Sequence, residues 1–226
     1  SDYITKPIRR GELLARLKSA GRVKLELERR KAREREILGE KRLLERANRQ
    51  LERLASADAL TGVANRLRFE EVYKREWARA QRTCSALSLA LLDIDELKSY
   101  NDTYGHLRGD ACLTAVAQAL ESTARRGSDL VARYGGDEFA VILPGFDEER
   151  ALDMARRLHR SVERLQIEQE ALAAADCVTV SIGISTTIPC PNQTPKSLVA
   201  QADKALYRSK MTGRNRVTHA RDILLH

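Results

Sequence analysis

ARYGGDEFAVI, residues 132–142, places two glycines and two acidic residues between two short apolar runs. Gly135 and Gly136 predict a tight turn, because glycine adopts positive backbone φ angles without steric cost. The stretch therefore predicts a β-hairpin with Asp137 and Glu138 at its tip. Adjacent acids at such a tip are most simply a solvent-exposed turn, so their role depends on whether the chain supplies a partner for the two carboxylates.

A second pair of acids follows an apolar run that predicts a buried strand. The run ALSLALL, residues 86–92, leads directly into Asp93, Ile94 and Asp95. Side chains alternate along a strand, so Asp93 and Asp95 are expected on one face and Ile94 on the other. If this strand end lies beside the hairpin tip, the carboxylates repel one another unless a cation lies between them.

Oxygen ligands without Cys or His favour Mg²⁺ or Mn²⁺, and two such ions about 4 Å apart can support nucleotidyl transfer. From these residues alone, a solvated acidic loop and a metal site both remain open.

The basic charge of the chain is confined to its N-terminal segment. The 226 residues carry a formal net charge of +8. Between residues 9 and 53 there are 16 Lys and Arg against 8 Asp and Glu, whereas from residue 58 onward each sign occurs 23 times. The basic segment has no aromatic residue that could stack on bases, so the solvated face of a long helix is favoured over nucleic-acid binding.

Cysteine spacing and hydropathy limit the class of protein. The four cysteines are scattered, with no CxxC pair, at Cys84, Cys112, Cys177 and Cys190. This pattern argues against a zinc site or a disulfide framework and predicts a cytoplasmic protein. No apolar run approaches the roughly 20 residues of a membrane span, and no signal peptide opens the sequence, so we expect no membrane association.

Residues 10–57 contain no proline and many strong helix formers. Two seven-residue series of apolar positions occur in this segment, out of phase with each other: Leu13, Ala20 and Leu27, then Ile37, Leu44 and Leu51. The pattern predicts a coiled-coil helix with a register break that pairs two copies of the chain. The alternative is a single extended helix that lies on its own domain.

From residue 58 onward, helix and strand signals interleave. Helices are expected at residues 67–81, 110–126, 148–165 and 195–211. Strands are expected at residues 86–95, on both arms of the hairpin, at 177–188 and around Val217. A hairpin within this alternation predicts an α/β (α+β) sandwich of the ferredoxin-like kind, with an antiparallel-containing central sheet flanked by helices.

RYGGDEF, residues 133–139, resembles the signature of the GGDEF family, the bacterial diguanylate cyclases. These enzymes condense two GTP molecules into cyclic di-GMP and release pyrophosphate. Three further segments resemble family motifs in the family's order and spacing: DALTGVANR at 58–66, DIDELKSYNDTYGHLRGD at 93–110 and ALYRSKMTGRNRV at 205–217. The resemblance covers residues 58–218 and implies a nucleotidyl-cyclase-like catalytic domain over residues 58–226.

The resemblance implies a role for each acidic motif residue. Two metal ions, Mg²⁺ or Mn²⁺, would be held by four positions: Asp93, the carbonyl of Ile94, Asp137 and Glu138. Asp137 and Glu138 would also be the catalytic residues, with Asp137 helping to remove the proton of the attacking ribose 3′-hydroxyl. How Asp137 and Glu138 divide these roles stays open.

The resemblance also implies how GTP is bound. Asn101 and Asp110 would read guanine, because a carboxylate accepts from a pair of donors that adenine lacks. The triphosphate would be held by cationic side chains and backbone amides: Lys98, Lys210, Arg214 and the amides around Glu96 and Leu97. Glu96 replaces the aromatic residue or histidine that is common there. An exposed basic helix end is the simpler interpretation of Lys210 and Arg214.

RGSD, residues 126–129, resembles the RxxD product-inhibition site of many family members. This implies that Arg126 and Asp129 bind cyclic di-GMP, with Arg157 as a second inhibitory arginine. An arginine that is simply exposed on a helix is the alternative for Arg157.

SDYITKPIRRGELLARL, residues 1–17, resembles the last strand and last helix of a response-regulator receiver domain, with Lys6 and Pro7 at its phosphate-sensing lysine and cis-proline. It implies a truncated receiver over residues 1–17 and an upstream histidine kinase, with the last receiver helix continuing into the coiled-coil helix predicted over residues 10–57; unrelated residues at the start of a helix are the alternative. We therefore expect a homodimeric diguanylate cyclase regulated through this receiver and the coiled-coil helix. The alternative is a catalytically idle domain that senses GTP or cyclic di-GMP.

Overall fold

The computed structural model describes residues 10–54, 56–169 and 177–223. They divide into two units, with the boundary after Leu54. The first unit is a single helix, α1 (Arg10–Leu54), and the second holds every other described element. The strand predicted at the start of the receiver-like tail lies outside the described residues, as do Lys6 and Pro7.

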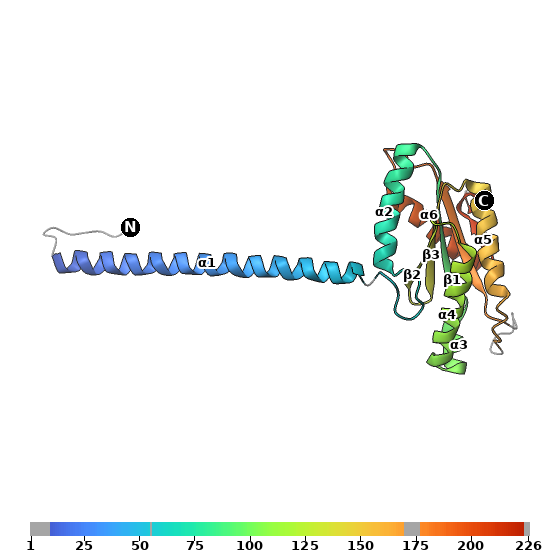
Figure 1. Cartoon of the computed structure of the whole chain (residues 1–226), viewed down its shortest axis with the longest axis horizontal. Helices are drawn as coiled ribbons and strands as arrows, with labels where there is room; N and C mark the ends of the chain where they lie inside the picture. The colour runs from blue at the N-terminus through green and yellow to red at the C-terminus, as the bar shows by residue number, and fades with distance from the viewer. Residues whose placement is uncertain (1–9, 55, 170–176, 224–226) are drawn as a thin grey trace. The chain divides into compact units, whose positions relative to one another are not determined.

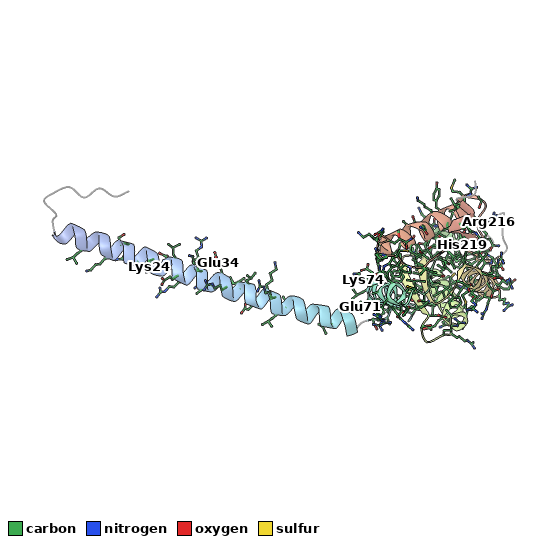
Figure 2. All side chains as sticks on the ribbon, turned by 90° about the horizontal axis from the view of Figure 1, so that it is seen from above. Lys24, Glu34, Glu71, Lys74, Arg216 and His219 are labelled. Carbon is green, nitrogen blue, oxygen red and sulfur yellow. The ribbon has the colours of Figure 1, made fainter. Side chains whose placement is uncertain are left out.

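α1 runs without interruption for 45 residues. Charged side chains such as Lys24 and Glu34 project from it into solvent (Figure 2). Several apolar side chains are also at least half exposed: Leu27, Ile37, Leu38, Leu43, Leu44 and Leu51. Pairing of α1 with a second copy along the predicted series would bury Ile37, Leu44 and Leu51, and this stays a prediction. No helix in the described ranges is long and apolar enough to cross a membrane.

A five-stranded sheet organises the second unit, in the order β2-β3-β1-β4-β5. The strands are β1 (Leu87–Ile94), β2 (Leu130–Gly135), β3 (Glu138–Pro144), β4 (Val180–Thr187) and β5 (Val217–His219). All neighbours pair antiparallel except β4 and β5, which are parallel. The predicted fold class, a mixed sheet with antiparallel strands flanked by helices, is confirmed.

Helices cover both faces of this sheet (Figure 1). One face packs against α2 (Arg66–Thr83) and α6 (Pro195–Met211). The other packs against α3 (Leu97–Tyr104), α4 (His106–Thr123) and α5 (Glu148–Glu163). A short helix, α7 (Ala220–Ile223), follows β5.

The central strand β1 is buried along its whole length. Leu89 and Leu91 enter the core beneath α2 and α6, whereas Ala90 and Leu92 enter the core beneath α4 and α5. This strict alternation sends Asp93 to the α2 and α6 face at the point where the strand ends. The fold therefore carries a carboxylate to the end of its most buried strand.

Candidate active site

The hairpin predicted from GGDEF forms between β2 and β3, with Asp137 in the turn and Glu138 as the first residue of β3. Arg133 holds this turn. Its guanidinium donates to the Gly136 carbonyl, 2.8 Å from Nη2 and 3.0 Å from Nε, and to Asp58 Oδ1 at 3.2 Å. A register shift between Arg133 and Gly135 marks a bulge, a feature that redirects side chains at the end of a strand pair.

The end of β1 lies directly beside the hairpin tip. Asp93 is the register partner of Glu138, and the Ile94 amide donates to the Asp137 carbonyl at 3.3 Å. This confirms the predicted adjacency of the two acidic segments. Asp93 is buried, while Asp137 and Glu138 are half-buried.

Burial and neighbouring charge both act on Asp93. Burial is the main reason that the pKa of Asp93 rises to about 6, and the negative charges of Asp137 and Glu138 raise it further. The ammonium of Lys210, on α6, lies 2.7 Å from Asp93 Oδ2 and only partly opposes this rise. Asp93 thus pairs with the Lys210 ammonium and also feels two neighbouring carboxylates, and this negative charge suits a hard cation.

The donor chemistry therefore fits Mg²⁺ or Mn²⁺. Within the described part of the chain, no group of three or more His, Cys, Asp or Glu side chains is gathered closely enough to hold an ion alone. A bound ion would need ligands besides carboxylates, such as a backbone carbonyl or the oxygens of a phosphate.

Asp95 has a structural role that was not predicted from the sequence. Its buried carboxylate accepts hydrogen bonds from Thr179 Oγ1 at 2.8 Å, from Ser181 Oγ at 2.7 Å and from the Asn215 amide at 3.1 Å. It thereby ties the end of β1 to β4 and to the loop that follows α6. In the sequence, the alternating hydroxyl residues of VTVS, residues 178–181, could have indicated this hydrogen-bond network.

The loop after α6 faces the loop after β1. Arg214 Nη2 lies 2.9 Å from Glu96 Oε1. Both residues have a left-handed backbone, with φ of 56° each, and Asn215 follows at 47°. The predicted phosphate-binding residues Glu96 and Arg214 are thus brought together. The Glu96 carboxylate takes part in an ion pair, beyond the backbone role expected for this position.

The two predicted guanine-reading residues come from consecutive helices. Asn101 lies in α3 and Asp110 lies in the first turns of α4, with Gly105 between the helices at φ 82°. Asp110 and Lys98 are exposed. Asn101 is half-buried, and its buried Oδ1 has no hydrogen-bond partner among the described residues.

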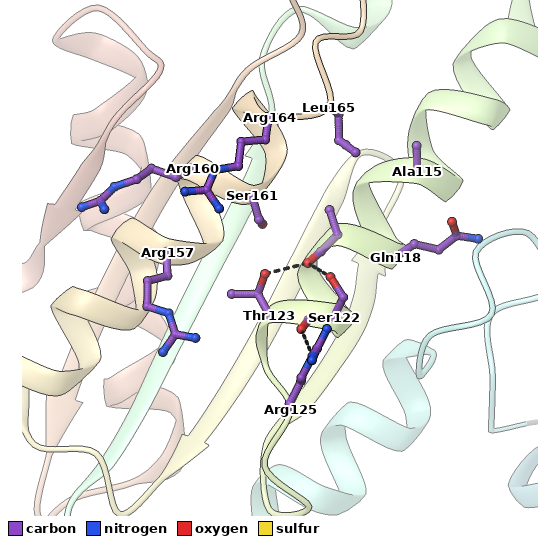
Figure 3. A pocket seen from close by; sticks show the side chains of 11 residues that line it. Ala115, Gln118, Ser122, Thr123, Arg125, Arg157, Arg160, Ser161, Arg164 and Leu165 are labelled. Atoms are coloured by element: carbon purple, nitrogen blue, oxygen red, sulfur yellow. Dashed lines mark hydrogen bonds between the residues drawn. The ribbon is translucent and has the colours of Figure 1, made fainter.

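The predicted inhibitory residues are distributed over two places. The Arg126 guanidinium lies over the Phe146 ring, 4.4 Å from its centroid, and the Asp129 amide donates to the Arg126 carbonyl at 2.9 Å. Asp129 Oδ2 is buried without a partner in the described ranges. Arg157 instead lines a groove of about 830 Å³ between α4 and α5 (Figure 3). Four arginines line that groove: Arg125, Arg157, Arg160 and Arg164.

A family model described as "Diguanylate cyclase, GGDEF domain" matches residues 55–216. The chain belongs to the GGDEF family. The identification made from the sequence motifs is thereby confirmed. The diguanylate cyclase DgcM of Escherichia coli is 38% identical over 194 residues, which are 82% of this chain and 45% of that protein. The probable diguanylate cyclase DgcC of E. coli is 35% identical over 168 residues, 74% of this chain and 44% of that protein. This GGDEF chain thus spans less than half the length of these curated relatives.

Solved structures support the same assignment. The GGDEF domain of DgcB from Caulobacter crescentus, in complex with c-di-GMP, is 36% identical with a TM-score of 0.67, covering 74% of this chain and 96% of that one. A structure of the DgcB coiled coil and GGDEF domain with c-di-GMP is 34% identical with a TM-score of 0.67, covering 84% and 98%. The diguanylate cyclase SiaD of Pseudomonas aeruginosa, with its activator SiaC, is 30% identical with a TM-score of 0.65, covering 92% and 79%.

Proposed function

We propose that this GGDEF chain is a diguanylate cyclase that condenses two GTP molecules into cyclic di-GMP and two pyrophosphates. The observation that carries the proposal is the register of β1 and β3, which sets Asp93 opposite Glu138 with Asp137 in the adjoining turn. Three neighbouring carboxylates at the end of a buried strand, one of them paired with the Lys210 ammonium, suit chemistry on a magnesium-bound triphosphate.

The proposed metal ligands are Asp93, the Ile94 carbonyl, Asp137 and Glu138. Two Mg²⁺ or Mn²⁺ ions bound there would lower the pKa of the attacking 3′-hydroxyl and stabilise charge on the transferred phosphoryl group. Asp137 is the proposed acceptor of the hydroxyl proton. Because the donor set falls short of a complete metal cage, triphosphate oxygens would supply the remaining ligands.

The cationic side chains would bind the triphosphate. Lys210 lies at the end of α6 and Arg214 in the loop that follows, and each is paired with a carboxylate, Asp93 and Glu96 respectively. Phosphate oxygens can replace these carboxylates as partners, because charge-assisted hydrogen bonds to phosphate are comparable in strength. Lys98, exposed on α3, and the amides around Glu96 and Leu97 would complete the set. Asn101 and Asp110 would select guanine.

Each domain would bind one GTP, so forming both phosphodiester bonds requires two domains that face each other. The exposed apolar side chains of α1 support a homodimer through this helix. A receiver domain upstream, phosphorylated by a histidine kinase, would then favour one way of pairing the two α1 helices. Sedimentation velocity of the whole chain and of a Leu44→Lys, Leu51→Lys variant tests the dimer, which the two lysines should dissociate.

Cyclic di-GMP is the proposed inhibitor as well as the product. Arg126 is exposed, Asp129 has an unpartnered oxygen, and Arg157 opens into the arginine-lined groove of Figure 3. Arginine forks bind phosphodiesters well, which supports this site. Arg157→Ala should weaken cyclic di-GMP binding in calorimetry, while Arg156→Ala, an exposed neighbour, should not.

The deciding experiment is incubation of the purified chain with GTP and Mg²⁺, followed by mass spectrometry for cyclic di-GMP and pyrophosphate. The wild type should form both products and Asp137→Asn should form neither. Absence of product from a wild type that still binds GTP or cyclic di-GMP would replace the proposal with a binding-only sensor.

A further inference from the structure

Gly109 lies against the side chain of Asn101. Gly109 is in the first turn of α4, is buried, and has an ordinary helical backbone. A Cβ atom at this position would lie 1.8 Å from Asn101 Oδ1 and 2.8 Å from Asn101 Cγ. Real Cβ atoms do not approach other heavy atoms so closely, so the amide of Asn101 occupies the volume that any other residue at 109 would fill.

The two ends of the Asn101 amide lie at different distances from residue 109. The Asn101 oxygen is the atom nearest to the Cβ position of residue 109, whereas Nδ2 is 3.3 Å from it. Oδ1 is buried without a hydrogen-bond partner in the described part of the chain, and Nδ2 is not among such buried atoms. The oxygen therefore faces the Gly109 backbone, and the NH₂ group is the end of the amide that lies farther from it.

A glycine here is otherwise unfavourable. Glycine is the weakest helix former after proline, and alanine the strongest, so helix formation alone would favour Ala at 109. Neither a turn nor a positive φ angle accounts for it, because Gly109 has neither. The Asn101 amide occupies the space that a side chain at 109 would take, so a larger residue there would displace the amide.

We propose that Gly109 is a positioning residue that sets Asn101 as an outward donor for base recognition. This inference rests on the proposed function, in which Asn101 and Asp110 contact guanine. An outward NH₂ donates to the O6 and N7 acceptor edge of a 6-oxopurine, while Asp110, the next residue after Gly109, accepts from N1–H and the exocyclic amine. Adenine, which presents an amino group at C6, places a donor against this donor. Gly109 thus contributes to selection of a 6-oxopurine nucleoside triphosphate without contacting it.

A double-mutant cycle on binding tests this directly. The probe is 3′-deoxy-GTP, which lacks the attacking hydroxyl, titrated with Mg²⁺ into the whole chain by calorimetry. Gly109→Ala and Asn101→Ala should each weaken binding by about tenfold or more, and the double variant by no more than about twofold beyond either, because residues in contact are not additive. Gly39→Ala, with open space around it, is the matched control and should leave binding unchanged.

Thermal unfolding supplies a second readout. Gly109→Ala should lower the melting temperature in the wild type and raise it in the Asn101→Ala background, where only the gain in helix propensity remains. Additive losses of affinity, or unchanged binding by Gly109→Ala, would overturn the inference alone. A wild type that binds the probe but forms no cyclic di-GMP from GTP would overturn the proposed catalysis and leave the inference standing. A wild type that does not bind the probe at all would overturn both.

Discussion

Lys210 Nζ lies 2.7 Å from Asp93 Oδ2, so the end of α6 supplies the cation nearest to the buried carboxylate of β1. The lysine is about one-third exposed, whereas the carboxylate is almost fully buried. The ammonium thus stands on the solvent side of an acid whose other neighbours, Asp137 and Glu138, are negative. In the proposed reaction, the Lys210 ammonium must leave the Asp93 carboxylate and bind the triphosphate when GTP and the metal ions bind.

Replacement of Lys210 by methionine should therefore separate metal binding from nucleotide binding. Without the ammonium, Mn²⁺ alone should bind about fivefold more tightly, because about 1 kcal/mol of competing charge interaction is removed. GTP should bind more weakly and turnover should fall. Calorimetry with each ligand measures the two effects, and Lys204→Met, on the exposed side of α6, is the control. Weaker Mn²⁺ binding by Lys210→Met would contradict the exchange.

The buried carboxylate of Asp95 should be important for stability. Asp95→Asn retains one acceptor oxygen and replaces the other by an NH₂ donor, which would face either Ser181 Oγ or the pair formed by Thr179 Oγ1 and the Asn215 backbone N–H. A mismatch of this kind should lower the free energy of unfolding by about 2–4 kcal/mol. Urea denaturation of the whole chain measures it, with the exposed Asp102→Asn as control. Equal stability of the two variants would show that the network is dispensable.

Close packing of α6 on β4 depends on Gly183. A Cβ there would lie 2.0 Å from the Leu206 amide nitrogen and 2.3 Å from the Ala202 carbonyl oxygen, both backbone atoms. Gly183→Ala should therefore push α6 off the sheet and lower the free energy of unfolding by about 3 kcal/mol or more. The variant should also lose activity, because α6 carries Lys210. Circular dichroism in denaturant gives the first value, and a near-neutral result would mean that α6 shifts freely.

Stability should fall in mildly acidic solution because of His219. Burial lowers its pKa below the ordinary 6.5, and Arg221 adds to this, while Glu148 and Asp222 only partly oppose it. The folded state therefore favours the neutral imidazole. Its stabilising contribution is complete above pH 6.5 and is lost as the pH falls from there through the folded pKa. His219→Gln should have a flatter dependence of melting temperature on pH between 8 and 5. An unchanged slope would assign the acid sensitivity to other groups.

The elements that carry the acids were predictable because their patterns are strong. β1 is a continuous apolar run that ends in acids, and the hairpin has two glycines between two apolar arms. Thr194 and Pro195 marked the start of α6, and the helix begins there. Such signals are local, and sheet pairing then brings Asp93 and Glu138 together from segments 45 residues apart in the chain.

Other parts of the site had no local signal. α3 is eight residues long and begins after Glu96, a left-handed N-cap residue that makes no capping hydrogen bond, so neither periodicity nor a cap predicted it. Asp95 finds Thr179 and Asn215 only through the tertiary fold. The space left by Gly109 for Asn101 also depends on how α3 packs on α4, which periodicity does not specify.

The ion pair between Glu96 and Arg214 joins two residues whose left-handed backbones cost about 1–3 kcal/mol each. Glycine at either position would relieve that cost and remove the side chain at the same time. Selection for heat resistance alone would therefore favour glycine at residues 96 and 214, whereas selection for turnover would oppose it. In laboratory evolution for thermal stability, substitutions in these two loops should be the first to raise stability at the cost of turnover.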